Sequence, residues 1–259
     1  MDENAQLLIE KFKEISNNGY IKNNSKSFGS IGLTFEKELG KNPDSMYFPD
    51  YRNIEIKCTS RYSKYPLYLF TVAFDGPTIP EINRIVSKYG WYDLDYKDKL
   101  VLFAKLGFKN SKLINNKYKF KLSFDKNKDK IYLNVYDIND KLIERKSYIY
   151  VNSIYNHINL KLNKLAIIYA SIKREKNANY FRYYKMNIYK LISFSKFLAL
   201  LENDIVGVDL IARINKSGID AGRYRNKNLV FYINKNKINE LFKIIYSYNN
   251  DTGEENVYI

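Results

Sequence analysis

Apolar and polar positions repeat with two different periods along this chain, and the period separates its predicted helices from its predicted strands. Apolar residues recur three and four positions apart in five segments, which predict helices over residues 3–16, 30–39, 81–88, 195–201 and 236–247. Alternating or more continuously apolar runs predict strands over residues 53–59, 67–74, 118–124, 131–136, 164–172, 204–214 and 228–233. The class is therefore mixed α/β, with a largely antiparallel second half.

Three local features of this pattern carry specific expectations. Asp2 precedes the first helix and can cap its N-terminus. The strand over residues 67–74 is the more apolar kind, which favours a central place in a sheet. The last helix would bury Leu241 and Ile245, and the polar tail from Asn249 onward is expected to be mobile.

Composition adds a strong basic charge to this picture. The chain has 259 residues, of which 45% are hydrophobic, so it can bury a sizeable core. Its net charge of +15 comes from 43 Lys and Arg against 28 Asp and Glu. Such an excess indicates a polyanionic partner, with nucleic acid first and an anionic membrane surface second. Codon bias is an alternative source of part of this charge, because AT-rich genes enrich Lys, Asn, Tyr and Ile together.

Cysteine content and hydropathy indicate the cellular compartment of the protein. Cys58 is the single cysteine, which excludes an intrachain disulfide, and no Cys/His zinc pattern occurs. The N-terminus is acidic and polar, unlike a signal peptide, and the apolar runs are shorter than the ~20 residues of a membrane helix. We therefore expect a cytoplasmic protein with no membrane partner.

Candidate chemistry is concentrated between Pro49 and Lys57. Asp50 ends a loop, and Glu55 and Lys57 lie two positions apart on the following strand, so both face the same side. Two converging carboxylates make an oxygen-rich site for Mg²⁺, to which the backbone carbonyl of Ile56 can add a ligand. Such a metal can polarise a phosphate and activate water, and Lys57 offers a positive charge to the transition state. An ordinary surface ion pair on an exposed strand is the alternative.

A third carboxylate lies upstream, on the predicted helix over residues 30–39. Glu36 would face the same cleft about one turn past the start of that helix and could bind a second metal, directly or through water. Ordinary helix surface charge is the alternative, and Glu38 is a competitor of the same kind.

These motifs together resemble a known nuclease family. The pattern Gly-x-x-x-Glu-x-x-Leu-Gly over residues 32–40, then Pro49-Asp50, then Ile54-Glu55-Ile56-Lys57, resembles the PD-(D/E)XK nucleases related to MutH. It is most similar to the MvaI/BcnI group of type II restriction endonucleases. Weaker matches follow in the right order as far as residue 245, among them Lys88-Tyr89-Gly90-Trp91 and Asn179-Tyr180-Phe181.

The resemblance implies roles for four residues. Asp50 and Glu55 match the metal-binding carboxylates of the family, Lys57 matches its catalytic lysine and Glu36 matches its auxiliary helix carboxylate. The cofactor it implies is Mg²⁺.

The resemblance also implies an architecture. The family has a restriction-endonuclease-like core, in which a central mixed sheet is flanked by helices, and a second, DNA-recognition lobe that forms a cleft with it. Here that implies one two-lobed nuclease over residues 1–259. The catalytic lobe would cover about residues 1–110 with later core strands, and the recognition lobe about 175–248. It further implies a monomer that needs no protein partner, and a cognate DNA methyltransferase in the same genome.

Candidate DNA contacts lie in two segments. Arg can pair with guanine through two hydrogen bonds, which favours Arg213, Arg223 and Arg225 as base readers, while Lys suits phosphates. The residues that we expect to contact DNA are Arg61, Tyr62, Lys64, Arg213, Lys216, Arg223, Arg225 and Asn226. A solvated basic hairpin is the alternative for the later group. The family's His-Asp-His-Gly stretch is absent from this region, so its target sequence cannot be transferred.

Three functions remain open on the sequence. The first is a type II restriction endonuclease that cleaves a short site in double-stranded DNA with Mg²⁺. The second is a MutH-like, methyl-directed nicking endonuclease with the same chemistry. The third is a basic DNA-binding module without catalysis, which would explain the charge but not the ordered set of Glu36, Asp50, Glu55 and Lys57.

Overall fold

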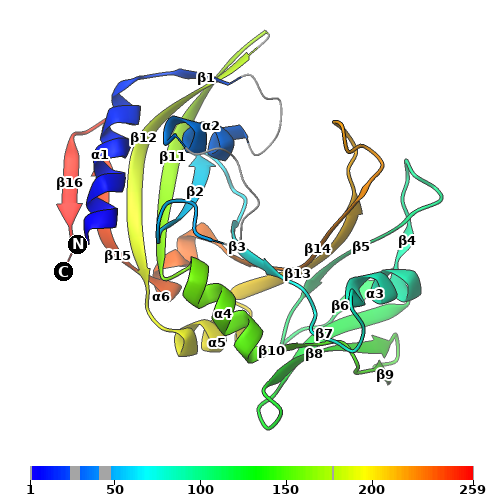
Figure 1. Cartoon of the computed structure of the whole chain (residues 1–259). Coiled ribbons are helices and arrows are strands. Elements are labelled where there is room, and N and C mark those ends of the chain that lie inside the picture. The colour runs from blue at the N-terminus through cyan, green and yellow to red at the C-terminus, as the bar shows by residue number, and fades with distance from the viewer. Residues whose placement is uncertain (1, 24–29, 41–47, 177, 259) are drawn as a thin grey trace. The chain divides into compact units, whose positions relative to one another are not determined.

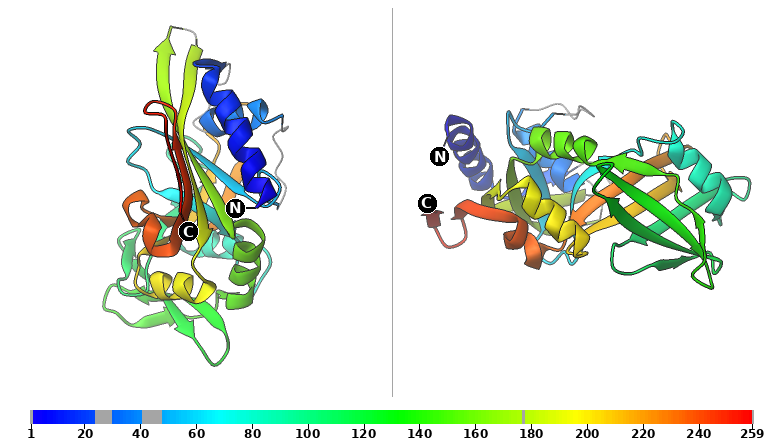
Figure 2. Two further views of the ribbon diagram at one scale, coloured as in Figure 1. Left: turned by 90° about the vertical axis from the view of Figure 1, so that its left-hand side faces the viewer. Right: turned by 90° about the horizontal axis from the view of Figure 1, so that it is seen from below.

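The chain folds into two compact units, each assembled from segments that are far apart in the sequence. The computed structural model describes residues 2–23, 30–40, 48–176 and 178–258. Unit 1 comprises residues 1–65, 158–193 and 238–259, and unit 2 comprises residues 66–157 and 194–237. Figures 1 and 2 show the elements of both units.

Unit 1 is built on a six-stranded mixed sheet in the order β16-β15-β12-β11-β2, with β1 also paired to β12. Only the pairing of β2 with β11 is parallel. The strands are β1 (Ile21–Asn23), β2 (Glu55–Ser60), β11 (Lys164–Glu175), β12 (Ala178–Leu191), β15 (Phe242–Asn249) and β16 (Glu254–Val257). The helices are α1 (Glu3–Asn17), α2 (Ser30–Glu38) and the short α6 (Ile238–Leu241).

One hydrophobic core joins α1 and α2 to this sheet. Phe12 of α1 and Phe35 of α2 are fully buried and share the core with Ile54, Ile56 and strand residues of β11, β12 and β15. Asp2 accepts a hydrogen bond from the backbone amide of Ala5 at 3.1 Å, which confirms the predicted N-cap. The buried core faces of these elements therefore hold β2 in a fixed place.

Unit 2 contains two five-stranded sheets. The first has the order β3-β14-β13-β5-β4, and the second has the order β10-β8-β7-β6 with β9 paired to β8. The strands of the first are β3 (Leu67–Val72), β4 (Trp91–Tyr92), β5 (Leu100–Leu106), β13 (Val206–Ile214) and β14 (Tyr224–Ile233). The strands of the second are β6 (Lys112–Ile114), β7 (Tyr118–Asp125), β8 (Lys130–Asp137), β9 (Leu142–Glu144) and β10 (Tyr148–Tyr150). The remaining elements of unit 2 are α3 (Glu81–Tyr89), α5 (Phe194–Glu202) and the 3-10 turn η1 (Lys235–Lys237). Helix α4 (Val151–Lys161) belongs to unit 2 as far as residue 157 and to unit 1 from residue 158.

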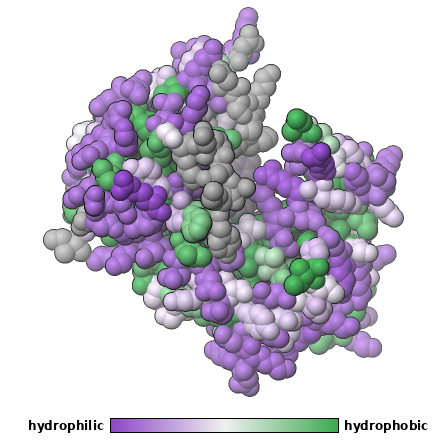
Figure 3. Space-filling model, in the orientation of Figure 1, coloured by the Kyte–Doolittle hydropathy of each residue, from purple (hydrophilic) through white to green (hydrophobic). Residues whose placement is uncertain are grey.

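Most predicted elements are confirmed. The helices α1, α2, α3 and α5 begin and end within one residue of their predicted bounds. The mixed α+β class, with a mixed sheet flanked by helices, is confirmed as well. No helix among the described residues is long and apolar enough to cross a membrane. The face drawn in Figure 3 is mainly hydrophilic, with isolated hydrophobic residues.

The C-terminal prediction is wrong. The helix expected over residues 236–247 is only four residues long, and Phe242–Asn249 form the strand β15, which pairs with β12. The β-branched and aromatic run from Ile244 to Tyr246 suits a strand, and pairing with a long neighbouring strand outweighs its helical spacing. The tail is not free either, because residues 254–257 pair with β15 and Tyr246 donates a hydrogen bond to Glu255 at 2.8 Å.

Strand β3 lies at an edge of its sheet, so the predicted central place is also wrong. Its apolar character comes from one face: Leu67, Leu69 and Val72 are buried, whereas Tyr68 is 46% exposed.

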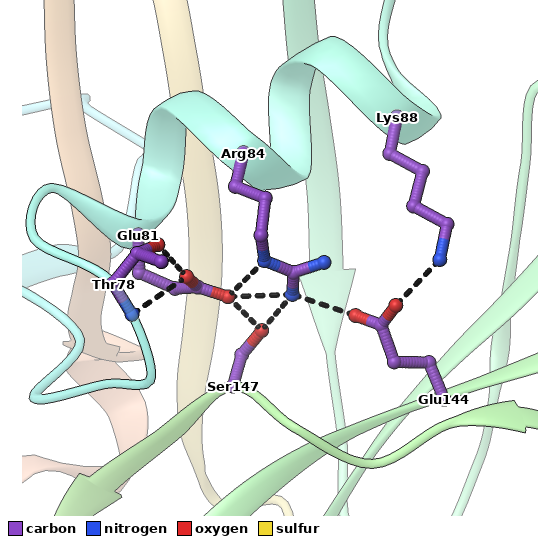
Figure 4. Close-up of polar contacts among 6 residues, drawn as sticks. All are labelled: Thr78, Glu81, Arg84, Lys88, Glu144 and Ser147. Carbon is purple, nitrogen blue, oxygen red and sulfur yellow. Dashed lines mark hydrogen bonds and ion pairs between the residues drawn. The ribbon is translucent and has the colours of Figure 1, made fainter.

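A buried ionic network fastens α3 to the neighbouring β9–β10 segment of unit 2 (Figure 4). Glu81 accepts hydrogen bonds from Arg84 at 2.5 Å and from Ser147 at 2.6 Å. Arg84 also donates to Glu144 at 2.6 Å, and Lys88 donates to the other oxygen of Glu144 at 2.5 Å. Such a fully hydrogen-bonded network compensates for the burial of its charges.

Candidate active site

A tight turn returns Asp50 to the start of β2. Tyr51 and Ile54 exchange two backbone hydrogen bonds of 3.0 and 2.8 Å, and Arg52 within the turn has a φ of 52°. The carboxylate of Asp50 then accepts a hydrogen bond from the backbone amide of Ile56 at 3.0 Å. Asp50 is therefore fixed beside the strand that carries Glu55 and Lys57.

Glu55 is the most deeply buried acid of this site, with 2% of its surface exposed. One carboxylate oxygen, Oε1, accepts a hydrogen bond from the amine of Lys57 at 2.5 Å. The other, Oε2, is buried and has no hydrogen-bond partner among the residues that the structure describes. A buried oxygen of this kind is costly unless a ligand satisfies it.

The electrostatics of the site follow from this geometry. Burial raises the pKa of Glu55; the positive charge of Lys57 opposes that shift and the negative charge of Asp50 adds to it. Burial lowers the pKa of Lys57, but the negative charges of Glu55 and Asp50 raise it by more, so the net shift of this pKa is upward. The negative charges of Asp50 and Glu55 lie close enough to affect each other, which favours a cation beside them.

The donor set fits a divalent metal that prefers oxygen. Asp50 and Glu55 supply carboxylate oxygens, and Mg²⁺ is commonly held by one or two carboxylates together with substrate phosphate and water. Within residues 2–23, 30–40, 48–176 and 178–258, no group of three or more His, Cys, Asp or Glu side chains could hold a metal. Among the described residues, Asp50 and Glu55 are thus the two carboxylates that could hold such a metal.

Glu36 lies on α2, the helix that packs against β2 through Phe35. A Cβ added to Gly32 would lie 3.9 Å from Oε1 of Glu36, so this side chain runs back along its own helix. Burial raises the pKa of Cys58, and the negative charges of Glu36 and Asp50 raise it further. Cys58 packs against the core. An auxiliary metal role for Glu36 stays a prediction.

The residues that follow β2 are exposed. Tyr62 is 85% exposed, and Arg61 and Lys64 also lie at the surface. The guanidinium of Arg61 lies 3.9 Å from the carboxylate of Asp251 and 5.3 Å from the centre of the Tyr184 ring. Asp251 could not be selected from the sequence, because its partners Arg61 and Arg182 lie far away along the chain.

The hairpin of β13 and β14 carries a cluster of cations. Arg213 and Arg225 are directly opposite each other in the register of the two strands. Burial lowers the pKa of Lys227, and the charges of Arg225 and Arg213 lower it further. No carboxylate lies within ion-pair distance of these three cations among the described residues. Like charges in such positions destabilise a hairpin unless an anion binds to it.

Three other predicted DNA contacts have partners within unit 2. Lys216 forms ion pairs with Asp93 and, at 2.9 Å, with Asp95. Arg223 pairs with Asp220 at 2.8 Å. Asn226 donates a hydrogen bond to Asn83 at 3.1 Å, and its own side-chain oxygen is buried without a partner among the described residues.

Comparisons with known proteins show similarity in sequence and in fold. The sequence model of the MvaI/BcnI restriction endonuclease family matches residues 9–242. The structure of a restriction endonuclease MvaI–cognate DNA substrate complex is similar with a TM-score of 0.86 and 27% sequence identity, over 94% of this chain and 98% of that one. The structure of MvaI without DNA has a TM-score of 0.57 and 24% identity, over 94% and 97%, and supports the fold alone. A comparison with curated protein sequences gives no match.

Proposed function

Because this chain belongs to the MvaI/BcnI restriction endonuclease family, we propose that it is a type II endonuclease that cleaves duplex DNA at a short specific site with Mg²⁺. The MvaI structure that it resembles at 27% identity was solved with cognate DNA. We assign the chemistry to Asp50, Glu55 and Lys57, with Ile56 as a backbone ligand and Glu36 as an auxiliary acid.

The observation that carries this proposal is the unsatisfied oxygen of Glu55. A buried carboxylate with one oxygen on Lys57 and one without a partner is suited to a cation that arrives with the substrate. Asp50, held by the amide of Ile56, adds the second oxygen ligand from the adjacent turn. In an ordinary surface ion pair, Glu55 would be exposed and water would bind its second oxygen.

The residues of the site have distinct tasks in phosphodiester hydrolysis. When bound, the metal supplies Lewis-acid polarisation of the scissile phosphate and activation of water. Asp50 and Glu55 would hold the metal, and so they determine where the scissile phosphate lies next to its positive charge. Lys57 stays protonated, since both acids raise its pKa, and offers a fixed positive charge to the negative charge that develops on the phosphate.

Unit 1 carries this chemistry, and we assign DNA recognition mainly to unit 2. The cations Arg213, Arg225 and Lys227 supply charge for the DNA backbone or for guanine edges. Arg61, Tyr62 and Lys64, which follow β2, are placed to contact the DNA strand near the cleaved bond. We further propose a monomer that acts in the cytoplasm, alongside a methyltransferase that protects the same site.

A cleavage assay tests the proposed function. Supercoiled plasmid and phage DNA are incubated with the protein in Mg²⁺ or in EDTA, beside the Lys57→Ala variant. We expect discrete fragments only with Mg²⁺ and wild-type protein, and their mapped ends give the target site. Nicked circles alone would replace restriction with a MutH-like nicking activity. Tight binding with no cleavage of methylated or unmethylated DNA would leave a DNA-binding module.

A further inference from the structure

Two loops of unit 2 are fastened to each other. One connects β4 to β5 (residues 93–99), and the other connects β13 to β14 (residues 215–223). Lys216 of the second loop pairs with Asp93 and Asp95 of the first. Lys99 of the first loop donates a hydrogen bond to the backbone carbonyl of Gly222 at 2.6 Å. The two loops therefore form one joint element, which we call the paired tip.

Each loop of the paired tip is also closed by its own hydrogen bonds. Asp93 accepts hydrogen bonds from the backbone amides of Asp95 at 2.9 Å and Tyr96 at 3.0 Å. In the other loop, the amide of Gly222 donates to Asn215 at 2.8 Å. Gly222 has a φ of +83°, and a Cβ there would lie 3.2 Å from the Tyr96 ring, so glycine suits this close approach. The paired tip is thus an ordered structure.

The paired tip exposes one large aliphatic side chain on each loop. Leu94 is 90% exposed and Ile219 is 99% exposed. A single exposed aliphatic residue is common at protein surfaces. Here the two lie on loops that ion pairs hold together, at the end of a hairpin that carries Arg213 and Arg225 next to its loop.

We propose that Leu94 and Ile219 read the C5-methyl groups of pyrimidines in the major groove of the target DNA. This inference rests on the proposed function. The end of the β13–β14 hairpin extends past Ala212 and Leu229, where pairing with β5 and β3 stops, and is two-stranded there. The major groove admits such a two-stranded β-ribbon, and apolar side chains there contact the methyl group of thymine. The cations of the hairpin hold the DNA backbone, and the aliphatic tips supply contacts that depend on sequence. Thymine and 5-methylcytosine both carry this methyl group.

This assignment gives Lys216 a task other than contact with phosphate. Its charge is already matched by Asp93 and Asp95, so it positions the loop that carries Ile219 against the loop that carries Leu94. Lys216 is then a positioning residue of the paired tip.

The test removes the methyl group from the DNA and the aliphatic side chain from the protein. One DNA fragment that wild-type protein cleaves is amplified with dTTP, with dUTP in place of dTTP, or with 5-methyl-dCTP in place of dCTP. Single-turnover cleavage rates are measured for wild type, Leu94→Ala and Ile219→Ala. Ile138→Ala, which removes a 58% exposed aliphatic side chain from a different hairpin of unit 2, is the matched control.

We expect uracil to slow wild-type cleavage by roughly fourfold for each lost methyl contact, the value of one buried methylene. Leu94→Ala and Ile219→Ala should cleave thymine DNA more slowly than wild type, and uracil should slow these two variants little further. Ile138→Ala should behave as wild type. If 5-methylcytosine raises the cleavage rate for wild type and Ile138→Ala only, Leu94 and Ile219 contact the methyl group of this base. Equal wild-type rates on all three DNAs would overturn the inference, as would variants slowed equally on all three. If wild-type protein with Mg²⁺ cleaves no DNA at all, no such fragment exists, and that result refutes the proposed function rather than this inference.

Discussion

The amine of Lys57 lies 2.5 Å from Oε1 of Glu55, while Oε2 of the same buried carboxylate has no partner among the described residues. One residue thus keeps a cation on one side and an unsatisfied oxygen on the other. A buried oxygen without a hydrogen-bond partner makes the folded state less stable, and an apolar group of the same shape would not carry this cost. Stability therefore does not account for this oxygen, and we propose that it binds a cation.

Glu55→Gln should abolish stabilisation of the protein by divalent metal. A ligand that binds the folded state alone stabilises it by about 1.4 kcal/mol at ten times its Kd, so the wild-type Tm should rise with Mg²⁺ or Ca²⁺. The neutral amide of Gln is a weaker metal ligand than the carboxylate, so the Tm of this variant should not respond. The measurement is thermal unfolding over a metal titration.

The exposed Glu10, on α1 of the same unit, supplies the control. Glu10→Gln removes the same charge from the protein and should keep the full response of the Tm to metal. An equal response in all three proteins would contradict a metal site at Glu55.

Arg225→Gln should weaken DNA binding and stabilise the free protein. It removes one of two like charges that face each other across β13 and β14, which relieves repulsion when no DNA is present. A lost phosphate contact reduces the slope of log K against log salt by about one, and a lost guanine contact costs about 1–3 kcal/mol of binding. Titrations at several salt concentrations and thermal unfolding measure both effects.

The comparison for the stability effect is Arg223→Gln. Arg223 already pairs with Asp220, so its removal should not raise the Tm of the free protein. If Arg225→Gln leaves the Tm, the affinity for DNA and the salt slope all unchanged, Arg225 has no role in binding DNA.

Glu144→Gln should destabilise unit 2 at neutral pH and much less in acid. Burial raises the pKa of Glu144, but its hydrogen bonds from Arg84 and Lys88 lower it more, to about 2. A carboxyl whose pKa is lowered by folding stabilises the protein above its ordinary pKa near 4.5. That contribution disappears as the pH falls from about 4.5 toward about 2. From this shift we expect a loss of about 2–3 kcal/mol at pH 7.

Denaturant unfolding from pH 7 to pH 3 measures this difference between wild type and variant. Asp140→Asn tests an exposed ion pair of the same unit, with Lys119, and should cost far less. A difference between Glu144→Gln and wild type that does not shrink below pH 4.5 would show that the network of Figure 4 is not held by ionised Glu144.

Local sequence signals predicted the helices well. Asp2 and the apolar spacing of Leu8 and Phe12 fixed the first helix, because a cap and a buried stripe are set by neighbouring residues. The strand of Glu55 and Lys57 was found for the same reason, since alternation of core and site residues is local. The strand signal also supplied Glu55 and Lys57, two central residues of the candidate site.

Long-range pairing decided what the sequence could not show. The longest strand, β12, runs over Ala178–Leu191 without clean alternation, and its stability comes from pairing with β1, β11 and β15. Helix α4 was not predicted, and Phe242–Asn249 form a strand because β12 lies beside them. The ion pairs of Lys216 join residues more than a hundred positions apart, so the sequence suggested a DNA contact where the structure has an internal partner.

The most direct test of the active site compares cleavage and binding in the same Lys57→Ala sample. In the proposed function Lys57 acts on the reacting phosphate and does not hold DNA. Its removal should therefore lower the single-turnover cleavage rate by about a hundredfold or more, as for other lost electrostatic groups. The Kd for the mapped target, measured in Ca²⁺ so that no cleavage occurs, should stay within a few-fold of wild type. A variant that binds and cleaves at the wild-type rate would contradict the assignment of Asp50, Glu55 and Lys57 as the active site.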